Sequence, residues 1–134
     1  MSANPRSAKL AQVMAIVNRT PDSFYDKGAT FAEAEALRRC AEVIEQGASI
    51  VDIGGVKAGP GEAVDAQEEI ERVVPTIAAA HERYPDVTIS VDTWRASVAE
   101  AAIAAGATLI NDTWACWDPE LIEVAGEHKA GYVC

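Results

Sequence analysis

The 134-residue sequence is poor in positive charge. It has 11 Lys and Arg against 21 Asp and Glu, which gives a formal net charge of −10. The few basic residues form no cluster, whereas a protein that binds nucleic acid needs a positive face to meet the phosphate backbone. We therefore expect no nucleic-acid partner.

The sequence is also poor in cysteine and histidine. Cys40, Cys116 and Cys134 lie far apart at irregular spacings. This argues against a disulfide framework and against a Cys-x-x-Cys metal or redox motif, and it favours a reducing, cytoplasmic location. His81 and His128 are also widely separated and show no metal-ligand spacing.

Long apolar runs are missing too. No run approaches the roughly 20 residues that span a bilayer, and residues 13–17 are too short for the core of a signal peptide. We expect no membrane segment and no signal peptide. Because 49% of the residues are apolar, the chain has enough apolar surface to bury the core of one domain. We assign that domain to residues 12–134 and a flexible tail to residues 1–11.

What the sequence does contain is an alternation of two kinds of segment. Short, β-branched apolar runs predict strands at residues 13–17, 49–53, 87–91, 108–110 and 131–134. Longer stretches with helical spacing separate them. The chain is therefore a βαβα protein.

Start and stop signals mark the helices. Thr30 with Glu33 predicts a capping box for the first helix, which should end at Gly47. Asp65 with Glu68 predicts the start of the second, and Pro75 within it should kink or split it. The third helix is expected over residues 96–105. The fourth is expected to begin with Asp118 as its cap and Pro119 at its first position.

Polar residues follow the predicted strands. The runs are apolar on both faces, which is typical of parallel strands covered by helices on both sides, and ligands meet such sheets at the carboxyl ends of the strands. Those ends carry Asn18, Asp52, Asp92 and Asn111. Asn and Asp are also ordinary turn and cap residues, so this pattern alone has two interpretations. Length favours an open flavodoxin-like sheet, because a (β/α)8 barrel typically needs about 250 residues.

Three stretches of the sequence favour the barrel over the open sheet. They read VMAIVNRTPDSFYDKG (residues 13–28), IVDIGG (residues 50–55) and ISVDTWRASVAEAAIAAGATLINDT (residues 89–113). In order and spacing they resemble the dihydropteroate synthase family, and the resemblance covers residues 12–134. It implies an α/β fold, the N-terminal half of a TIM (β/α)8 barrel with about four βα units and a fifth strand.

The resemblance also implies a reaction. The family joins 6-hydroxymethyl-7,8-dihydropterin diphosphate to 4-aminobenzoate, with Mg²⁺, and releases pyrophosphate. The implied partners are therefore the pterin and 4-aminobenzoate, and a homodimer is compatible with this interpretation. Carried over to this sequence, Asn18 resembles the residue that meets Mg²⁺ and the pyrophosphate, and residues 20–24 resemble a loop that closes over the substrate.

Asp92 and Asn111 resemble the pair that hydrogen-bonds the pterin ring. This role suits their chemistry, because an aminopyrimidinone edge offers N–H donors to a carboxylate and mixed groups to an amide. The alternative for Asp92 is a carboxylate that caps the third helix.

The second loop departs from the family. After Asp-Ile-Gly-Gly the family usually reads Glu-Ser-Thr-Arg-Pro-Gly, whereas residues 56–61 read VKAGPG. The loop therefore lacks the hydroxyl and the guanidinium that reach toward 4-aminobenzoate and pyrophosphate. Lys57 is either a remaining phosphate-binding residue or a solvated surface lysine, since an ammonium is a point charge and not a bidentate clamp. We expect synthase activity to be weak or absent.

Trp114 and Trp117 stand where the family has small residues. They would narrow the pterin mouth, stack on another flat ligand, or pack under the fourth helix, and the last is the default. Two alternative functions remain: a pterin-binding methyltransferase domain, and a non-catalytic protein that binds a pterin or a partner.

Overall fold

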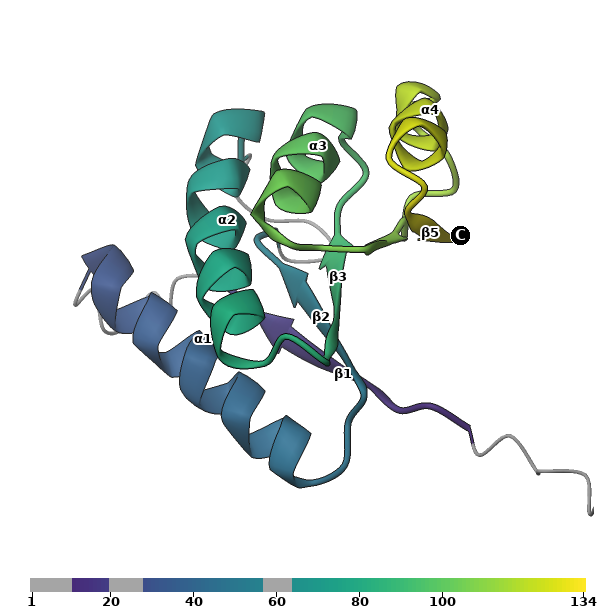
Figure 1. Ribbon diagram of the computed structural model, residues 1–134. Helices are drawn as coiled ribbons and strands as arrows, with labels where there is room; N and C mark the ends of the chain where they lie inside the picture. The colour runs from purple at the N-terminus through teal and green to yellow at the C-terminus, as the bar shows by residue number, and fades with distance from the viewer. Residues whose placement is uncertain (1–10, 20–27, 57–63) are drawn as a thin grey trace, which may run out of the picture.

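The structure, a computed structural model, describes residues 11–19, 28–56 and 64–134 (Figure 1). Strands and helices alternate along these residues. In chain order they are β1 (Met14–Asn18), α1 (Gly28–Glu45), β2 (Ile50–Gly54), α2 (Ala66–Arg83), β3 (Thr88–Asp92), α3 (Ala96–Ala105), β4 (Leu109–Asn111), α4 (Glu120–Glu127) and β5 (Gly131–Val133).

The five strands form one parallel sheet in the order β1-β2-β3-β4-β5. Right-handed crossovers that always step to the next strand in one direction place every helix on the same face. In Figure 1 the helices α1 to α4 form one layer on one side of the strands. A flavodoxin-like sheet would need the order 2-1-3-4-5. The N-terminal half of a TIM barrel is therefore confirmed, and helical cover on both faces is wrong.

The core lies between the sheet and the helical layer. Val17, Ile53, Val91 and Ile110 point toward the helices and are buried. Among the described residues, no helix covers the opposite face, and Ile16 of β1 is 62% exposed there. In a barrel this uncovered face is the interior. Asp52 belongs to this face, which explains how a polar residue fits in the middle of an otherwise apolar strand.

The expected helix signals are only partly right. Asp65 caps α2 by accepting a hydrogen bond from the Glu68 N–H at 2.8 Å, and Gly47 follows α1 with φ of 108°. However, α1 begins at Gly28, so a cap at Thr30 is wrong, because Thr and Glu are also tolerated inside a first helical turn. A split at Pro75 is wrong as well. Pro75 lies on the solvent side of a continuous α2, where water can solvate the carbonyl that loses its partner.

Asp118 caps two helices. Its Oδ1 accepts a hydrogen bond from the Glu120 N–H at 3.1 Å at the start of α4. Its Oδ2 accepts one from the Ala96 N–H at 2.9 Å at the start of α3. The sequence indicated the first cap but not the second. Within the described residues, none of the helices is long and apolar enough to cross a membrane.

Candidate functional site at the strand ends

The register of the sheet aligns the predicted site residues. Asn18 pairs with Gly54, Gly54 with Asp92, and Asp92 with Asn111. Residues paired in this way on parallel strands project from the same face, here the one without helices. The structure thus brings Asn18, Asp92 and Asn111 into a single row at the carboxyl ends of the strands. Lys57 and residues 20–24 lie outside the described residues.

A buried carboxylate orients Asn111. Asp52 is 1% exposed, and its Oδ1 accepts a hydrogen bond from the Ser90 hydroxyl at 2.6 Å. Its Oδ2 accepts one from Nδ2 of Asn111 at 3.1 Å. Because an ionised carboxylate only accepts, the amide of Asn111 must turn its nitrogen toward Asp52. Its oxygen is therefore available as an acceptor for another group.

Asp92 lies next to Asn111 in a setting that resists ionisation. Burial and the negative charge of Asp52 raise its pKa to about 6, and Glu69 and Asp112 add smaller effects in the same direction. A hydrogen bond from the Thr113 hydroxyl at 3.3 Å opposes the rise. Space for the carboxylate comes from Gly54, where a Cβ would lie 3.3 Å from that of Asp92.

Asp92 does not cap the third helix, so that alternative is wrong. Asp118 accepts from the Ala96 N–H, and the Thr93 hydroxyl accepts from the Arg95 N–H at 3.2 Å. Other residues therefore supply the acceptors for these two N–H groups at the start of α3. Asp92 keeps its carboxylate at the edge of a small pocket, which is lined by Val56, Glu69, Asp92, Thr93, Trp94, Thr113 and Trp114.

The two tryptophans that follow β4 do not pack under α4. Trp114 is 50% exposed and lines the pocket beside Asp92, and Trp117 is 74% exposed. The default expectation from the sequence was therefore wrong. The Asp112 carboxylate holds the intervening turn by accepting hydrogen bonds from the N–H groups of Trp114 and Cys116, and this turn directs the indoles outward.

Glu69, which lines the pocket, forms an ion pair with Arg95 that sequence reasoning missed. Glu69 is 1% exposed and accepts from Nη1 of Arg95 at 2.9 Å, while Nη2 donates to the Val64 carbonyl at 2.6 Å. Burial raises the pKa of Glu69, and hydrogen bonds from Thr93 and Arg95 oppose the rise. The Arg95 guanidinium also lies over the Trp94 ring at 4.3 Å. The sequence did contain one sign that Glu69 is buried, because Glu69 lies on the apolar stripe of α2, four residues before Val73.

Two further arginines hold the end of β2, where the second loop begins. Nη1 of Arg72 donates to the Gly55 carbonyl at 2.9 Å, and the backbone N–H of Arg19 donates to the Gly54 carbonyl at 2.6 Å. Burial and the nearby Arg72 charge lower the pKa of the Arg19 side chain, and Glu33 opposes this effect. A larger residue at Gly55 would force its surroundings to shift, because a Cβ would lie only 2.9 Å from Cγ1 of the buried Val73.

Comparison with known proteins bears out the resemblance. Residues 14–134 match the profile of the family described as "Pterin binding enzyme". "Inactive dihydropteroate synthase 2" of Mycobacterium tuberculosis (strain ATCC 25618 / H37Rv) is 58% identical over 134 residues, which is 100% of this chain and 42% of the relative. The chain thus spans less than half the length of that relative.

Two solved structures have the same fold. A dihydropteroate synthase of Xanthomonas albilineans with 4-aminobenzoic acid has a TM-score of 0.82 and 38% identity, over 90% of this chain and 44% of that one. Dihydropteroate synthase of Anaplasma phagocytophilum with bound 6-hydroxymethylpterin-monophosphate has a TM-score of 0.82 and 30% identity, over 90% and 47%. Both are similar to this chain over the barrel's N-terminal half.

Proposed function

Because the chain belongs to the pterin binding enzyme family, we propose that the protein binds a reduced pterin at its strand ends and has weak or no dihydropteroate synthase activity. The observation that carries this proposal is the pairing of Asp92 with Asn111 in the sheet register. The Anaplasma structure, which holds a pterin monophosphate, supports the choice of ligand.

The two side chains offer complementary acceptors. The Asp92 carboxylate would accept N–H groups from the aminopyrimidinone edge of the pterin. The oxygen of Asn111 would accept another, because Asp52 already holds the amide nitrogen. Such N–H donors favour the ionised form of Asp92. Since its pKa is about 6 in the free protein, pterin affinity should rise as the pH rises through about 6.

Asn18 would provide a magnesium ligand. Its amide is exposed at the end of β1 in the same row as Asp92, and a neutral oxygen donor suits Mg²⁺, which takes few protein ligands beside substrate phosphates. The residues present therefore fit the ion. When bound, Mg²⁺ would neutralise charge on the diphosphate of the substrate.

The second loop explains why turnover would fail. Displacement of pyrophosphate is accelerated by groups that stabilise its departing charge, and residues 56–61, VKAGPG, supply only Lys57 for this purpose. A hydrogen bond to a charged group contributes about 1.5–3 kcal/mol, so losing one or two slows the step by roughly tenfold to a thousandfold or more. The similar Mycobacterium tuberculosis protein carries the name "inactive". The homodimer and the cytoplasmic location stay predictions.

A binding experiment tests the pterin site. Calorimetric titration of the full-length protein with 6-hydroxymethyl-7,8-dihydropterin diphosphate and Mg²⁺ should show one site per chain. Asp92→Ala and Asn111→Ala should each weaken binding by roughly 10- to 150-fold, because each removes a buried hydrogen bond to the ring. Asp86→Ala is the matched control, since Asp86 is an exposed carboxylate near the opposite end of β3.

Turnover is tested separately from binding. With 4-aminobenzoate present, pyrophosphate release should be weak or absent while the pterin remains bound. Equal pterin affinity in wild type and both variants would overturn the binding site. Release at the rate of an active synthase assayed alongside would overturn the loss of activity and leave the pterin site in place.

A further inference from the structure

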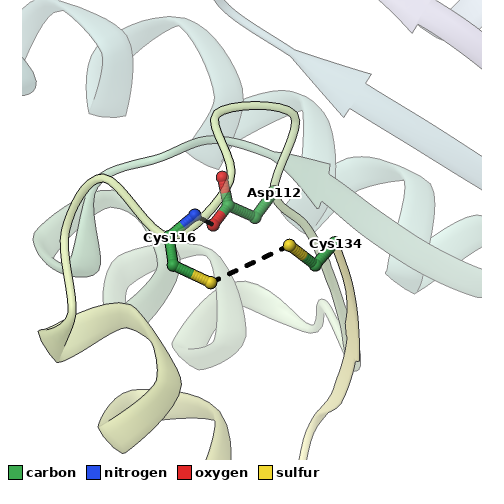
Figure 2. A group of neighbouring side chains, drawn as sticks. All are labelled: Asp112, Cys116 and Cys134. Carbon is green, nitrogen blue, oxygen red and sulfur yellow. Dashed lines mark hydrogen bonds between the residues drawn. The ribbon is translucent and has the colours of Figure 1, made fainter.

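A second cluster of ligand-type side chains lies beyond the ends of β4 and β5. The Sγ atoms of Cys116 and Cys134 are 3.8 Å apart, although the residues are 18 positions apart in the sequence. One ligand atom from each cysteine and one from the Asp112 carboxylate lie within 4.8 Å of one another. Figure 2 shows the two sulfur atoms facing each other, with the carboxylate beside them.

The backbone is built to hold Cys116 in this position. Asp112 accepts from the Cys116 N–H at 2.8 Å, and Ala115 and Cys116 both have left-handed backbone angles, with φ of 52° and 62°. Non-glycine residues adopt this conformation at a cost, so the surrounding contacts must impose it. The Tyr132 hydroxyl donates to the same carboxylate and ties the turn to β5.

The negative charge of the Asp112 carboxylate is the next feature of the cluster. Asp112 is 2% exposed, and in the part of the chain that the structure describes no Lys, Arg or His forms an ion pair with it. A buried carboxylate without a positive partner favours a bound cation. Cys116 is half-buried and Cys134 is exposed, so an ion can reach the cluster from solvent.

We propose that Asp112, Cys116 and Cys134 bind a thiophilic divalent ion of the zinc class. Two thiolates at about 2.3 Å from a tetrahedral ion lie about 3.8 Å apart, and the observed separation is 3.8 Å. A disulfide would instead require about 2.05 Å. Binding replaces the two S–H bonds by metal–sulfur bonds and releases both protons to solvent, while Asp112 supplies the third ligand and water the fourth.

Hydrogen bonds around the carboxylate prepare it for this role. The N–H groups of Trp114 and Cys116 and the hydroxyl of Tyr132 orient Asp112, as outer-shell groups orient the ligands of zinc sites. Two thiolates and a carboxylate suit zinc better than magnesium, which prefers oxygen ligands. The site therefore does not depend on the magnesium proposed at Asn18.

Cobalt is the probe that tests the ligand set. The full-length protein, reduced and kept free of oxygen, is titrated with Co²⁺ and then with Zn²⁺. We expect one ion per chain, a thiolate-to-cobalt charge-transfer absorption, and its loss when zinc displaces cobalt. Cys116→Ser and Cys134→Ser should each reduce the absorption, because one thiolate remains, and the double variant should abolish it. Each single variant should weaken zinc binding by about tenfold or more, since even an outer-shell partner contributes that much.

The control is Cys40→Ala. Cys40 is a residue of α1 and is buried in the core, so its loss should leave the stoichiometry and the spectrum unchanged. Cys134 is exposed, and its serine variant should remain folded, which circular dichroism checks. No ion bound by the reduced protein, cobalt bound without the charge-transfer band, or unchanged affinity in both serine variants would each overturn the proposal.

Discussion

The raised pKa of Asp92 should give the protein a pH-dependent stability that one substitution removes. The ordinary value of 3.8 applies to the unfolded chain, whereas burial and the charge of Asp52 raise the folded value to about 6. Between these two values the folded protein holds a proton that the unfolded protein has lost. By linkage, the contribution of Asp92 to the free energy of unfolding falls as the pH rises through this window.

The size of the effect follows from the shift. A rise from 3.8 to about 6 corresponds to about 3 kcal/mol at roughly 1.4 kcal/mol per unit. Asp92 is partly exposed, and solvent screening reduces this to about 1–2 kcal/mol. Asp92→Asn mimics the protonated side chain and still offers an acceptor to Thr113. Relative to wild type it should therefore gain about 1–2 kcal/mol between pH 4 and pH 7.

Urea unfolding of the full-length protein and the variant at intervals from pH 4 to pH 7.5 measures this gain. The observable is the difference between their free energies of unfolding as a function of pH, so that other titrating groups cancel. Asp86→Asn, at an exposed carboxylate, should give a flat difference. A flat difference for Asp92→Asn as well would refute the reasoning. A gain in stability together with lost pterin binding would identify Asp92 as a residue retained for its ligand.

Two further substitutions test the supports of the site by urea unfolding. Arg95→Ala leaves Glu69 buried without its ion-pair partner and should cost about 3–5 kcal/mol. Arg38→Ala breaks an exposed pair and should cost much less; equal costs would contradict the assignment. Asp118→Ala removes one acceptor from α3 and one from α4 and should cost about 1–2 kcal/mol, and Asp118→Asn should recover most of that loss if capping is the cause.

Local chemistry was enough to predict the elements and the row of polar strand ends. The apolar, β-branched runs, such as residues 50–53, are strands at the predicted places, and polar residues stand at their carboxyl ends. The barrel was not predictable in this way. Strand order depends on the crossovers, which local patterns do not specify. Length alone favoured an open flavodoxin-like sheet, which is wrong. The barrel was expected only because of the motifs around Asn18, Asp52 and Asn111.

The contacts that sequence reasoning missed are long-range. The Glu69–Arg95 pair spans 26 positions and the Asp118–Ala96 cap spans 22, so no local pattern contains both partners. Cys116 and Cys134 belong to the same class. Their spacing contains no Cys-x-x-Cys motif, and it could not reveal that β4 and β5 are neighbours and bring Cys116 and Cys134 together.

If the second loop alone abolishes turnover, restoring its chemistry should restore activity. In the family pattern the hydroxyl and the guanidinium occupy the positions of Ala58 and Gly59, and Pro60 and Gly61 are already in place. The double substitution Ala58→Thr with Gly59→Arg adds both groups without changing the length of the loop. Each hydrogen bond to the departing pyrophosphate contributes about 1.5–3 kcal/mol, so the pair should raise pyrophosphate release by at least about 100-fold.

The control for this experiment keeps the size of the new side chains and removes their chemistry. Ala58→Val with Gly59→Met introduces neither the hydroxyl nor the guanidinium, and it should leave the protein as inactive as before. Affinity for 6-hydroxymethyl-7,8-dihydropterin without its diphosphate should be unchanged in both double variants, because Asp92 and Asn111 are untouched. If the Thr-Arg variant binds pterin normally and still releases no pyrophosphate, the defect lies elsewhere in the protein. Recovery of pyrophosphate release would instead show that the strand ends still recognise the pterin and that the protein lost only the groups of the second loop that bind pyrophosphate.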